Sequence, residues 1–534
     1  MSQISTSISK SQLSEEDKHE VQFSRTSTLV GSACNDVLHR SSEKHKLVEA
    51  DEDEDPMKWN KAKKLKVVIA VVGFSILTSG ATPAFSIGLS QMTEDLDTTT
   101  ELSTVAEAIF VCAFALPPMV LAGLSEQYGR SKIYCVSYLL YVLLHLPIAF
   151  CTGITGVILG RLCQGLAASV GSTLTAGSIA DMYDGYERGI YLSLFAASNP
   201  FAAGVAPICY SYVPEMYRLG MPGQHHGAGG WRWIQLIEMA AAGAWGVVMA
   251  CWVKETRLNV ILQNKAQRLR LQTGDLSIKA PSELCRVSKR QMFRGSALLP
   301  LKLLCTESAV LAFSLFIGYA YAIYYALQGS IEHVFSTLYE AEYDMSNARV
   351  AFVFATLCVG TTIGWVFNYC FQERWFYTRF RHKHSVEARL GSSMVAGVVF
   401  SAGSFVYAFT TYEFVHWTVP CLAIVVIMAG IFPIYYSSMN YISDCYGANA
   451  SSALAALALV RNLVGGVVML VIRKWLDGMG FQWCLLMVAV MGTFLSIIPI
   501  ALFVYGGRLR SRSRYCLEEQ EDDIKKVSMK TSHV

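Results

Sequence analysis

Long apolar runs separated by short polar segments make up most of the chain. A transmembrane α-helix needs about 20 mostly apolar residues, and twelve runs of this kind can be recognised. They lie at roughly 67–89, 102–122, 133–150, 154–177, 190–212, 232–253, 308–335, 347–371, 391–412, 418–440, 452–472 and 483–505. The pattern predicts an all-α membrane protein whose twelve transmembrane helices lie in the lipid bilayer.

Polar stretches divide these runs into two groups of six. Residues 1–60 are rich in Ser and charged residues and include the acidic run Glu49 to Asp55, so we expect a disordered tail there. The other expected parts are a six-helix bundle at 61–253, a basic linker at 254–307, a second six-helix bundle at 308–505 and a tail at 506–534. We expect the linker to lie on anionic lipid headgroups.

The distribution of Lys and Arg predicts the orientation. If the N-terminus is cytoplasmic, the segments on that side of the membrane contain 28 basic residues and the exterior loops contain three. Adding Arg232 and Arg349, which lie at the edges of spans, raises the exterior number to five. Because cytoplasmic loops are enriched in Lys and Arg, we expect both termini to be cytoplasmic.

Composition excludes several classes of protein. Only 16% of the residues are charged, against about 25% in soluble proteins, and 53% are hydrophobic. The formal net charge of +3 is too small to indicate a nucleic-acid partner. The fifteen Cys are scattered, without a Cys-x-x-Cys pair or a His cluster, so no metal site is expected. Without a Gly-rich phosphate loop or a nucleophile elbow, neither a cofactor nor enzyme activity is predicted.

A short internal repeat indicates duplication. Ile179-Ala-Asp181-Met-Tyr183 follows the fourth span and Ile442-Ser-Asp444-Cys-Tyr446 follows the tenth. Their equivalent positions in a six-plus-six plan favour two pseudo-symmetric bundles that move about a central site, as in many secondary transporters.

Several motifs resemble those of the major facilitator superfamily, and in particular the fungal twelve-span drug:proton antiporters, which export drugs, polyamines and mycotoxins. The resemblance covers about residues 56–510. It is carried by Leu121-Ala-Gly-Leu-Ser-Glu126-Gln-Tyr-Gly129-Arg130-Ser-Lys132, Arg161-Leu-Cys-Gln164-Gly165, Trp231-Arg-Trp233, Asn440-Tyr-Ile-Ser-Asp444-Cys-Tyr446 and Arg461-Asn-Leu. It implies the major facilitator fold and alternating access.

The fifth span departs from the family pattern. The family's Gly-Pro-x-x-Gly-Gly element, associated with antiport, is here Ala206-Pro207-Ile-Cys-Tyr210-Ser211. Small residues let helices approach closely, so Tyr210 and Ser211 are expected to reshape the contact between the halves. The substitution leaves the direction of coupling open.

The loop motif predicts a conformational latch. Glu126 can accept hydrogen bonds from guanidinium groups, with Arg130 and Arg188 as its expected partners, and Gly129 permits a tight turn. Asp181, in the repeated segment, belongs to the same expected cluster. Such a latch would stabilise one access state. The alternative interpretation is an ordinary solvated charge pair.

Charged residues inside the spans are candidates for proton coupling, because they are costly in lipid. The residues expected to take part are Glu107, Arg161 and Glu238. The resemblance implies that Arg161 tunes a nearby carboxylate, although it could instead be a fixed hydrogen-bond hub. His145 is interpreted as structural, and Glu332, with its neighbour His333, as exposed to water.

Tyrosines mark a candidate substrate site. Tyr321 and Tyr325 lie four residues apart on one helix face and could stack on a planar or cationic organic molecule, although aromatic faces often serve only packing. The candidate substrate-binding residues are Gln164, Tyr321, Tyr325, Tyr435, Asn440 and Arg461. Arg461 could also be a hydrogen-bond hub. A hydrophobic organic compound is expected as substrate.

The leading hypothesis is a proton-coupled exporter of small organic molecules, such as a secondary metabolite, toxin or drug. We expect a monomeric, multi-pass protein of the plasma membrane whose partners are its substrate, protons and lipid. One alternative is proton-coupled uptake, favoured by the altered fifth span. Another is a non-transporting sensor, which the short tails disfavour.

Overall fold

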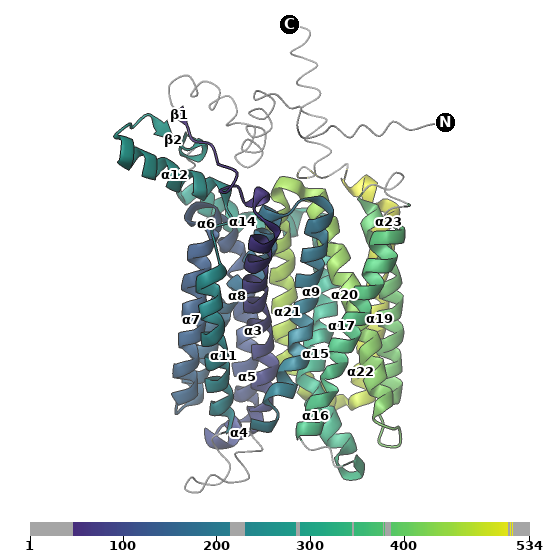
Figure 1. Ribbon diagram of the computed structural model, residues 1–534. Helices are drawn as coiled ribbons and strands as arrows, with labels where there is room; N and C mark the ends of the chain where they lie inside the picture. Colours follow the sequence, from purple (N-terminus) through teal and green to yellow (C-terminus); the bar gives the residue numbers. More distant parts are fainter. Residues whose placement is uncertain are drawn as a thin grey trace.

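The computed structural model describes residues 46–213, 230–284, 289–343, 347–376 and 386–510, with the single residues 379, 513 and 515. Some side chains inside these ranges are not described, namely those at 122, 126, 185–186, 289–297, 340–343, 347–348 and 448. Within the described ranges, twelve helices are long and apolar enough to cross a membrane. They form two bundles of six, side by side (Figure 1), which confirms the predicted fold class.

The first bundle is built from six spans, one of which is broken. Its helices are α3 (Lys61–Ile87), α5 (Thr100–Phe114) with α6 (Pro118–Tyr128), α7 (Arg130–Phe150), α8 (Ile154–Met182), α9 (Gly185–Tyr210) and α11 (Gly230–Trp252). The short helix α4 (Leu89–Asp95) joins α3 to α5. The break between α5 and α6 lies at Pro117 and Pro118, because proline removes a backbone donor and clashes with the preceding turn.

The second bundle has the same number of spans. Its helices are α15 (Ser308–Tyr343), α16 (Asn347–Val353) with α17 (Ala355–Phe367) and the π-helix η3 (Asn368–Phe376), η4 (Glu387–Leu390) with α19 (Gly391–Thr410), α20 (Thr418–Tyr446), η5 (Gly447–Asn449) with α21 (Ala450–Met479), and α22 (Phe481–Leu495) with α23 (Ile497–Arg510). Buried apolar side chains form a separate large core in each bundle, while residues such as Val247 and Phe494 are exposed where lipid would lie.

Two pairs of helices bring the bundles together, α5 with α21 and α9 with α17. Glycines allow the close approach. A Cβ added to Gly204 on α9 would meet the carbonyl oxygen of Phe354 at 2.7 Å, and one added to Gly466 on α21 would collide with the sulfur of Cys112. Tyr210 and Ser211 each have a partner within the first bundle. Tyr210 lies close enough to Glu238, in its own bundle, to interact with its charge, and Ser211 bonds to the carbonyl of Ile208.

The two ends of the bundles differ in structure. At one end lie the linker helices α12 (Leu258–Thr273) and α14 (Lys289–Thr306), the start of α3 and the end of α23 (Figure 1). At the opposite end lie α4 and α16 (Figure 1). We call these ends the linker side and the far side. The linker side is the one expected to be cytoplasmic.

The last part of the expected disordered tail is instead folded against the linker. Residues 46–60, the strap, include β1 (Lys46–Leu47), which pairs in parallel with β2 (Ile278–Lys279), and η2 (Pro56–Lys58). Val48 of the strap packs with Leu262, Ala266 and Ala280 of the linker. This segment folds because apolar side chains such as Val48 are buried against the linker, although most of its residues are polar. Residues 1–45 and the tail from 516 lie outside the described residues.

Charge complementarity also holds the strap. Lys265 on α12 donates to Asp51 and Glu54, each at 2.7 Å. Partial burial lowers the pKa of Lys265, but the hydrogen bonds to these two carboxylates outweigh this effect. The pKa of Lys265 is therefore raised above its usual value. The linker also contains α13 (Pro281–Leu284), which contacts α12. Helix α14 contacts α6 and α21, so it touches both bundles.

Candidate functional site

A buried chain of polar side chains crosses the first bundle and centres on Arg161 of α8. Arg161 is fully buried and donates to the side-chain oxygen of Gln164 at 2.9 Å. The amide nitrogen of Gln164 lies 3.0 Å from Nε2 of His145 on α7. The same His145 nitrogen lies 3.7 Å from a carboxylate oxygen of Glu238 on α11. Three helices are therefore joined by one polar network.

Aromatic rings surround the guanidinium of Arg161. Its central carbon lies 4.3 Å from the ring centres of both Phe85 and Phe110, where cation–π attraction stabilises the charge. Two of its nitrogens, Nε and Nη2, have no hydrogen-bond partner among the described residues. A buried cation with unused donors is poised to respond to a change of charge nearby.

Glu107 of α5 occupies a second buried position close to this network. Its side chain is 1% exposed and accepts a hydrogen bond of 2.6 Å from Ser86 of α3. Arg161 and Arg473 of α21 both lie close enough to act on its charge. Glu238 and Glu107 both interact electrostatically with Arg161. Among the described residues, neither forms an ion pair with it.

The three residues expected to couple protons are therefore brought into one region. His145, interpreted from the sequence as structural, lies in the network between Gln164 and Glu238, and its Nδ1 lies 2.9 Å from the carbonyl oxygen of Tyr141. A single His in an apolar span is unusual enough to have signalled this. Glu332 is paired with Arg473 at 3.4 Å and only partly exposed, so it is less open to water than expected.

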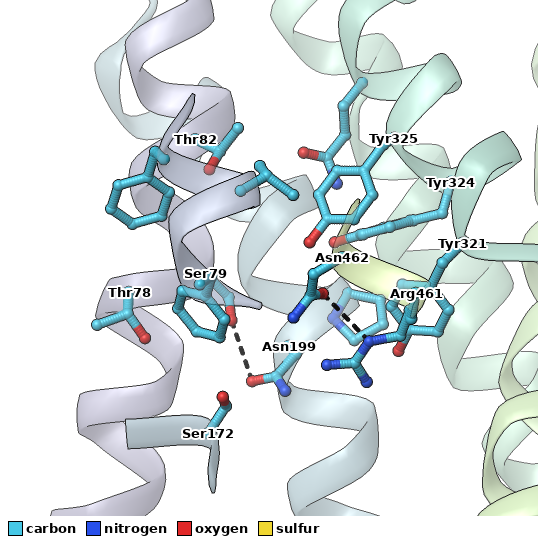
Figure 2. Close-up of a pocket in the computed structure, with 15 residues that line it drawn as sticks. Thr78, Ser79, Thr82, Ser172, Asn199, Tyr321, Tyr324, Tyr325, Arg461 and Asn462 are labelled. Carbon is cyan, nitrogen blue, oxygen red and sulfur yellow. Dashed lines mark hydrogen bonds between the residues drawn. The ribbon is translucent and has the colours of Figure 1, made fainter. Parts of the chain in front are cut away.

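A small cavity lies between the two bundles (Figure 2). It is lined by residues of both halves, namely Thr78, Ser79, Thr82, Phe110, Val111, Phe114, Ser172, Asn199, Pro200, Tyr321, Tyr324, Tyr325, Gln328, Arg461 and Asn462. Its volume is about 50 Å³, far below the ~300 Å³ or more of sites for drug-sized molecules. The bundles must therefore separate before such a molecule can enter.

The candidate substrate residues fall into two groups. Tyr321, Tyr325 and Arg461 line the cavity, and Tyr435 lies behind them, 5.2 Å from Tyr321 between ring centres. Gln164 and Asn440 do not line it. Gln164 belongs to the network around Arg161. Asn440 lies beside Tyr436, whose hydroxyl donates to the carbonyl of Gly189 in the other bundle.

The bundles contact each other on both sides of the cavity. On the linker side, Tyr436 bonds to Gly189 at 2.9 Å, and the indole of Trp365 donates to Ser193 at 3.2 Å. On the far side, Lys474 of α21 pairs with Glu101 of α5 at 2.8 Å. The bundles are therefore in contact at both ends of the molecule.

Two members of the expected latch, Arg130 and Asp181, are paired with each other. Arg130 pairs with Asp181 at 2.8 Å, and Arg257 of the linker approaches the same carboxylate at 3.5 Å. The side chain of Glu126 lies outside the described residues. Arg188 is exposed and forms no ion pair with any residue that the structure describes, so its expected pairing with Glu126 stays a prediction.

Glu255 of the linker was missed by sequence reasoning. Its carboxylate accepts from the backbone nitrogens of Arg130 and Ser131 at the start of α7, where the helix dipole favours a negative charge. Gly129 has a φ of 88°, which favours glycine, and a Cβ there would collide with Glu255. Spacing along the chain cannot reveal this contact, because 125 residues separate Glu255 from Arg130.

The second bundle repeats the latch. Arg389, at the start of its third span, pairs with Asp444 at 2.9 Å and with Glu373 at 3.5 Å. Asp444 is the counterpart of Asp181 in the sequence repeat. The two aspartates therefore occupy equivalent places in the bundles, each bound to the arginine that begins the neighbouring span.

Comparisons with known proteins agree with this architecture. The family model described as Major Facilitator Superfamily matches residues 69–470. The efflux pump radE of Floropilus chiversii is 27% identical over 498 residues, which cover 91% of this chain and 89% of that protein. An uncharacterized transporter of Schizosaccharomyces pombe is 30% identical over 420 residues, 78% of this chain and 69% of that protein.

Solved structures show the same fold. The proton:xylose symporter XylE from E. coli, bound to 6-bromo-6-deoxy-D-glucose, superposes with a TM-score of 0.61 at 15% identity. The match covers 84% of this chain and 96% of that chain. At this identity the likeness concerns the arrangement of the helices alone.

Proposed function

Because the chain belongs to the major facilitator superfamily of membrane transporters, we propose that it exports small organic molecules in exchange for protons, by alternating access. The relatives reported above are transporters, which agrees with the prediction that the chain performs no chemistry on its substrate. The name efflux pump, carried by one relative over most of both chains, supports export.

One observation carries the proton coupling. Glu107 and Glu238 are both buried and both interact electrostatically with Arg161. Among the described residues, neither forms a hydrogen bond or an ion pair with it. A carboxylate in this setting can gain or lose a proton when its surroundings change, since burial and a nearby cation act on it in opposite directions. His145 links Glu238 to Gln164 and so connects this site to α8.

The structure also supplies the moving parts. The glycine contacts between α9 and α17 and between α5 and α21 join the bundles on either side of the cavity. The latch at Arg130 and Asp181 lies on the linker side. Breaking contacts at one end while keeping those at the other would open the cavity to one face of the membrane at a time.

Proton-coupled uptake is the second candidate. It is favoured by the fifth span, where Tyr210 replaces a glycine of the antiport element and faces Glu238 in its own bundle. We further propose that the protein acts as a monomer in the plasma membrane, with the linker side in the cytoplasm. The excess of basic residues on the linker side supports this orientation.

Reconstituted vesicles with an acidic interior test the function. A panel of aromatic acids, amides and amines is offered outside the vesicles, and their accumulation is compared with that in protein-free vesicles. Antiport predicts protein-dependent accumulation of at least one compound, and Glu107→Gln or Glu238→Gln should reduce it by about tenfold or more. The matched control is Glu413→Gln, which changes an exposed carboxylate outside the network.

Three results would contradict the proposal. Full gradient-driven accumulation in both Glu107→Gln and Glu238→Gln would remove these carboxylates from the coupling. Accumulation only when the exterior is acidic would assign the protein to uptake. A loss that also appears in Glu413→Gln would show that removing any carboxylate has this effect, which the proposal does not allow.

A further inference from the structure

The cavity between the bundles contains a cation with no carboxylate partner. Arg461 of α21 lines the cavity, and its Nε donates to the side-chain oxygen of Asn462 at 3.2 Å. Its guanidinium carbon lies 4.7 Å from the ring centre of Tyr321 and 5.3 Å from that of Tyr435. These are neutral partners. Within the described residues, no Asp or Glu is paired with Arg461.

The rest of the cavity lining is also without negative charge. The lining residues are hydroxyl, amide, aromatic and apolar side chains, with Arg461 as their one charged member among the residues that the structure describes. An arginine deep in a membrane protein costs at least about 2.5 kcal/mol. A cation kept there without a carboxylate marks a place where an anion would be stabilised.

Neighbouring carboxylates are engaged elsewhere. Glu107 lies one turn of α5 from Phe110 and accepts from Ser86 at 2.6 Å. Glu332 lies one turn of α15 from Gln328 and pairs with Arg473 at 3.4 Å. Neither lines the cavity, so the charge that a molecule meets on entering is that of Arg461.

Two aromatic rings of the cavity lining, Tyr321 and Phe110, already hold the protein's own cations. Tyr321 and Tyr435 hold Arg461, and Phe110 holds Arg161 at 4.3 Å. A cationic molecule would have to compete with these guanidinium groups for the same rings and would be repelled by their charge. At Tyr321, the charge of Arg461 therefore favours an anionic ligand over a cationic one.

Two polar groups at the cavity have unused hydrogen-bonding capacity. The amide nitrogen of Asn462, whose residue is 1% exposed, has no partner among the described residues, and neither does the side-chain oxygen of Gln328. Figure 2 shows Asn462 beside Arg461 and Tyr325. The free Asn462 donor and the Arg461 guanidinium lie next to each other, which suits the two oxygens of one carboxylate.

From this arrangement we infer that the cavity binds an aromatic organic anion, a carboxylate held by Arg461 and Asn462 with its ring against Tyr321 and Tyr325. That this anion is the transported molecule rests on the proposed function. Arg461 would then determine the charge of the substrate. If one proton enters as one monoanion leaves, two positive charges move inward per cycle, against one for a neutral substrate and none for a monovalent cation.

Binding to the purified, full-length protein tests the inference. The three probes share one ring system and differ in charge: 2-naphthoate, neutral 2-naphthamide and cationic 2-naphthylmethylammonium, measured by equilibrium dialysis at neutral pH. The wild type is expected to bind 2-naphthoate about tenfold or more tightly than either other probe. Arg461→Gln should lose this preference, because the amide retains no charge, while Arg461→Lys should keep part of it.

Controls separate charge recognition from misfolding. Lys66→Gln removes an exposed cation from α3, away from the cavity lining, and should leave all three affinities unchanged. Should Arg461→Gln fail to fold, the wild-type comparison and Arg461→Lys still decide the matter. Equal binding of the three probes, tighter binding of the ammonium, no measurable binding of 2-naphthoate, or an unchanged preference in Arg461→Gln would overturn the inference.

Transport of the same probes distinguishes this inference from the proposed function. Selective binding of 2-naphthoate without any proton-driven movement would leave the anion site standing and remove the transport proposal. Proton-driven export of the amide and the ammonium, with no preference for the acid, would uphold export and contradict the anion site. Membrane current recorded during transport should be largest for 2-naphthoate.

Discussion

At the scale of single residues, the interior charges explain most of what is specific to this chain. The sequence pointed to Glu107, Arg161, Glu238 and Arg461 because charges are rare inside apolar spans. It could not show that the first three share one region while Arg461 stands apart from every carboxylate that the structure describes. Those relations depend on which helices face each other, and residues such as Glu255, distant in sequence, could not be foreseen as partners.

Gly129 allows a test of the turn between α6 and α7. Both Gly129 and Gly274 have positive φ, at 88° and 71°, but a Cβ would strike Glu255 at Gly129 and meets nothing within 4 Å at Gly274. We expect Gly274→Ala to cost about 1 kcal/mol from backbone strain and Gly129→Ala to cost more. Thermal unfolding of the purified variants measures both, and equal losses would show that Glu255 does not constrain the turn.

At the scale of elements, the apolar pattern predicted which segments cross the membrane but not where each helix ends. Helix α8 continues to Met182 and α21 to Met479, beyond the apolar runs. Outside the bilayer, backbone hydrogen bonds can continue a helix even where its residues are polar. The strap was missed because its acidic run resembles a disordered tail. Its partner strand lies more than 200 residues away, at Ile278–Lys279.

The two latches differ in burial, which predicts unequal effects. The side chains of Arg130 and Asp181 are 9% and 14% exposed, whereas those of Arg389 and Asp444 are 21% and 40% exposed. Breaking a buried pair costs about 3–5 kcal/mol, and an exposed pair contributes about 0–1 kcal/mol. Asp181→Asn should therefore slow transport more than Asp444→Asn.

Initial transport rates in vesicles, normalised to the amount of protein, measure this difference. Both substitutions keep the size of the side chain, so each serves as the control for the other. A larger defect in Asp444→Asn, or wild-type rates in Asp181→Asn, would show that the latch of the first bundle does not control the access states.

At the scale of the whole molecule, the small cavity means that transport requires the bundles to separate and rejoin. A larger residue at Gly204 should oppose rejoining, because a Cβ there would meet the backbone of Phe354. Overpacking costs about 1–3 kcal/mol, enough to shift the equilibrium between states by about tenfold or more. Gly204→Val should reduce transport accordingly.

Gly243→Val provides the matched control, since a Cβ at Gly243 meets nothing within 4 Å. Cross-linking of cysteines placed on α9 and α17 would report how often the bundles lie together. Unchanged transport in Gly204→Val, with unchanged cross-linking, would mean that the α9 and α17 contact is not part of the cycle.

Exchange of substrate for protons requires protons to move in the direction opposite to the substrate. Vesicles holding the wild-type protein and a trapped pH-sensitive dye, with no imposed gradient, are given 2-naphthoate outside. Antiport drives protons out as the compound enters, so the interior should become more alkaline. Passive entry of the neutral acid in protein-free vesicles changes the pH in the opposite sense. Acidification beyond that of protein-free vesicles would indicate symport and contradict the account.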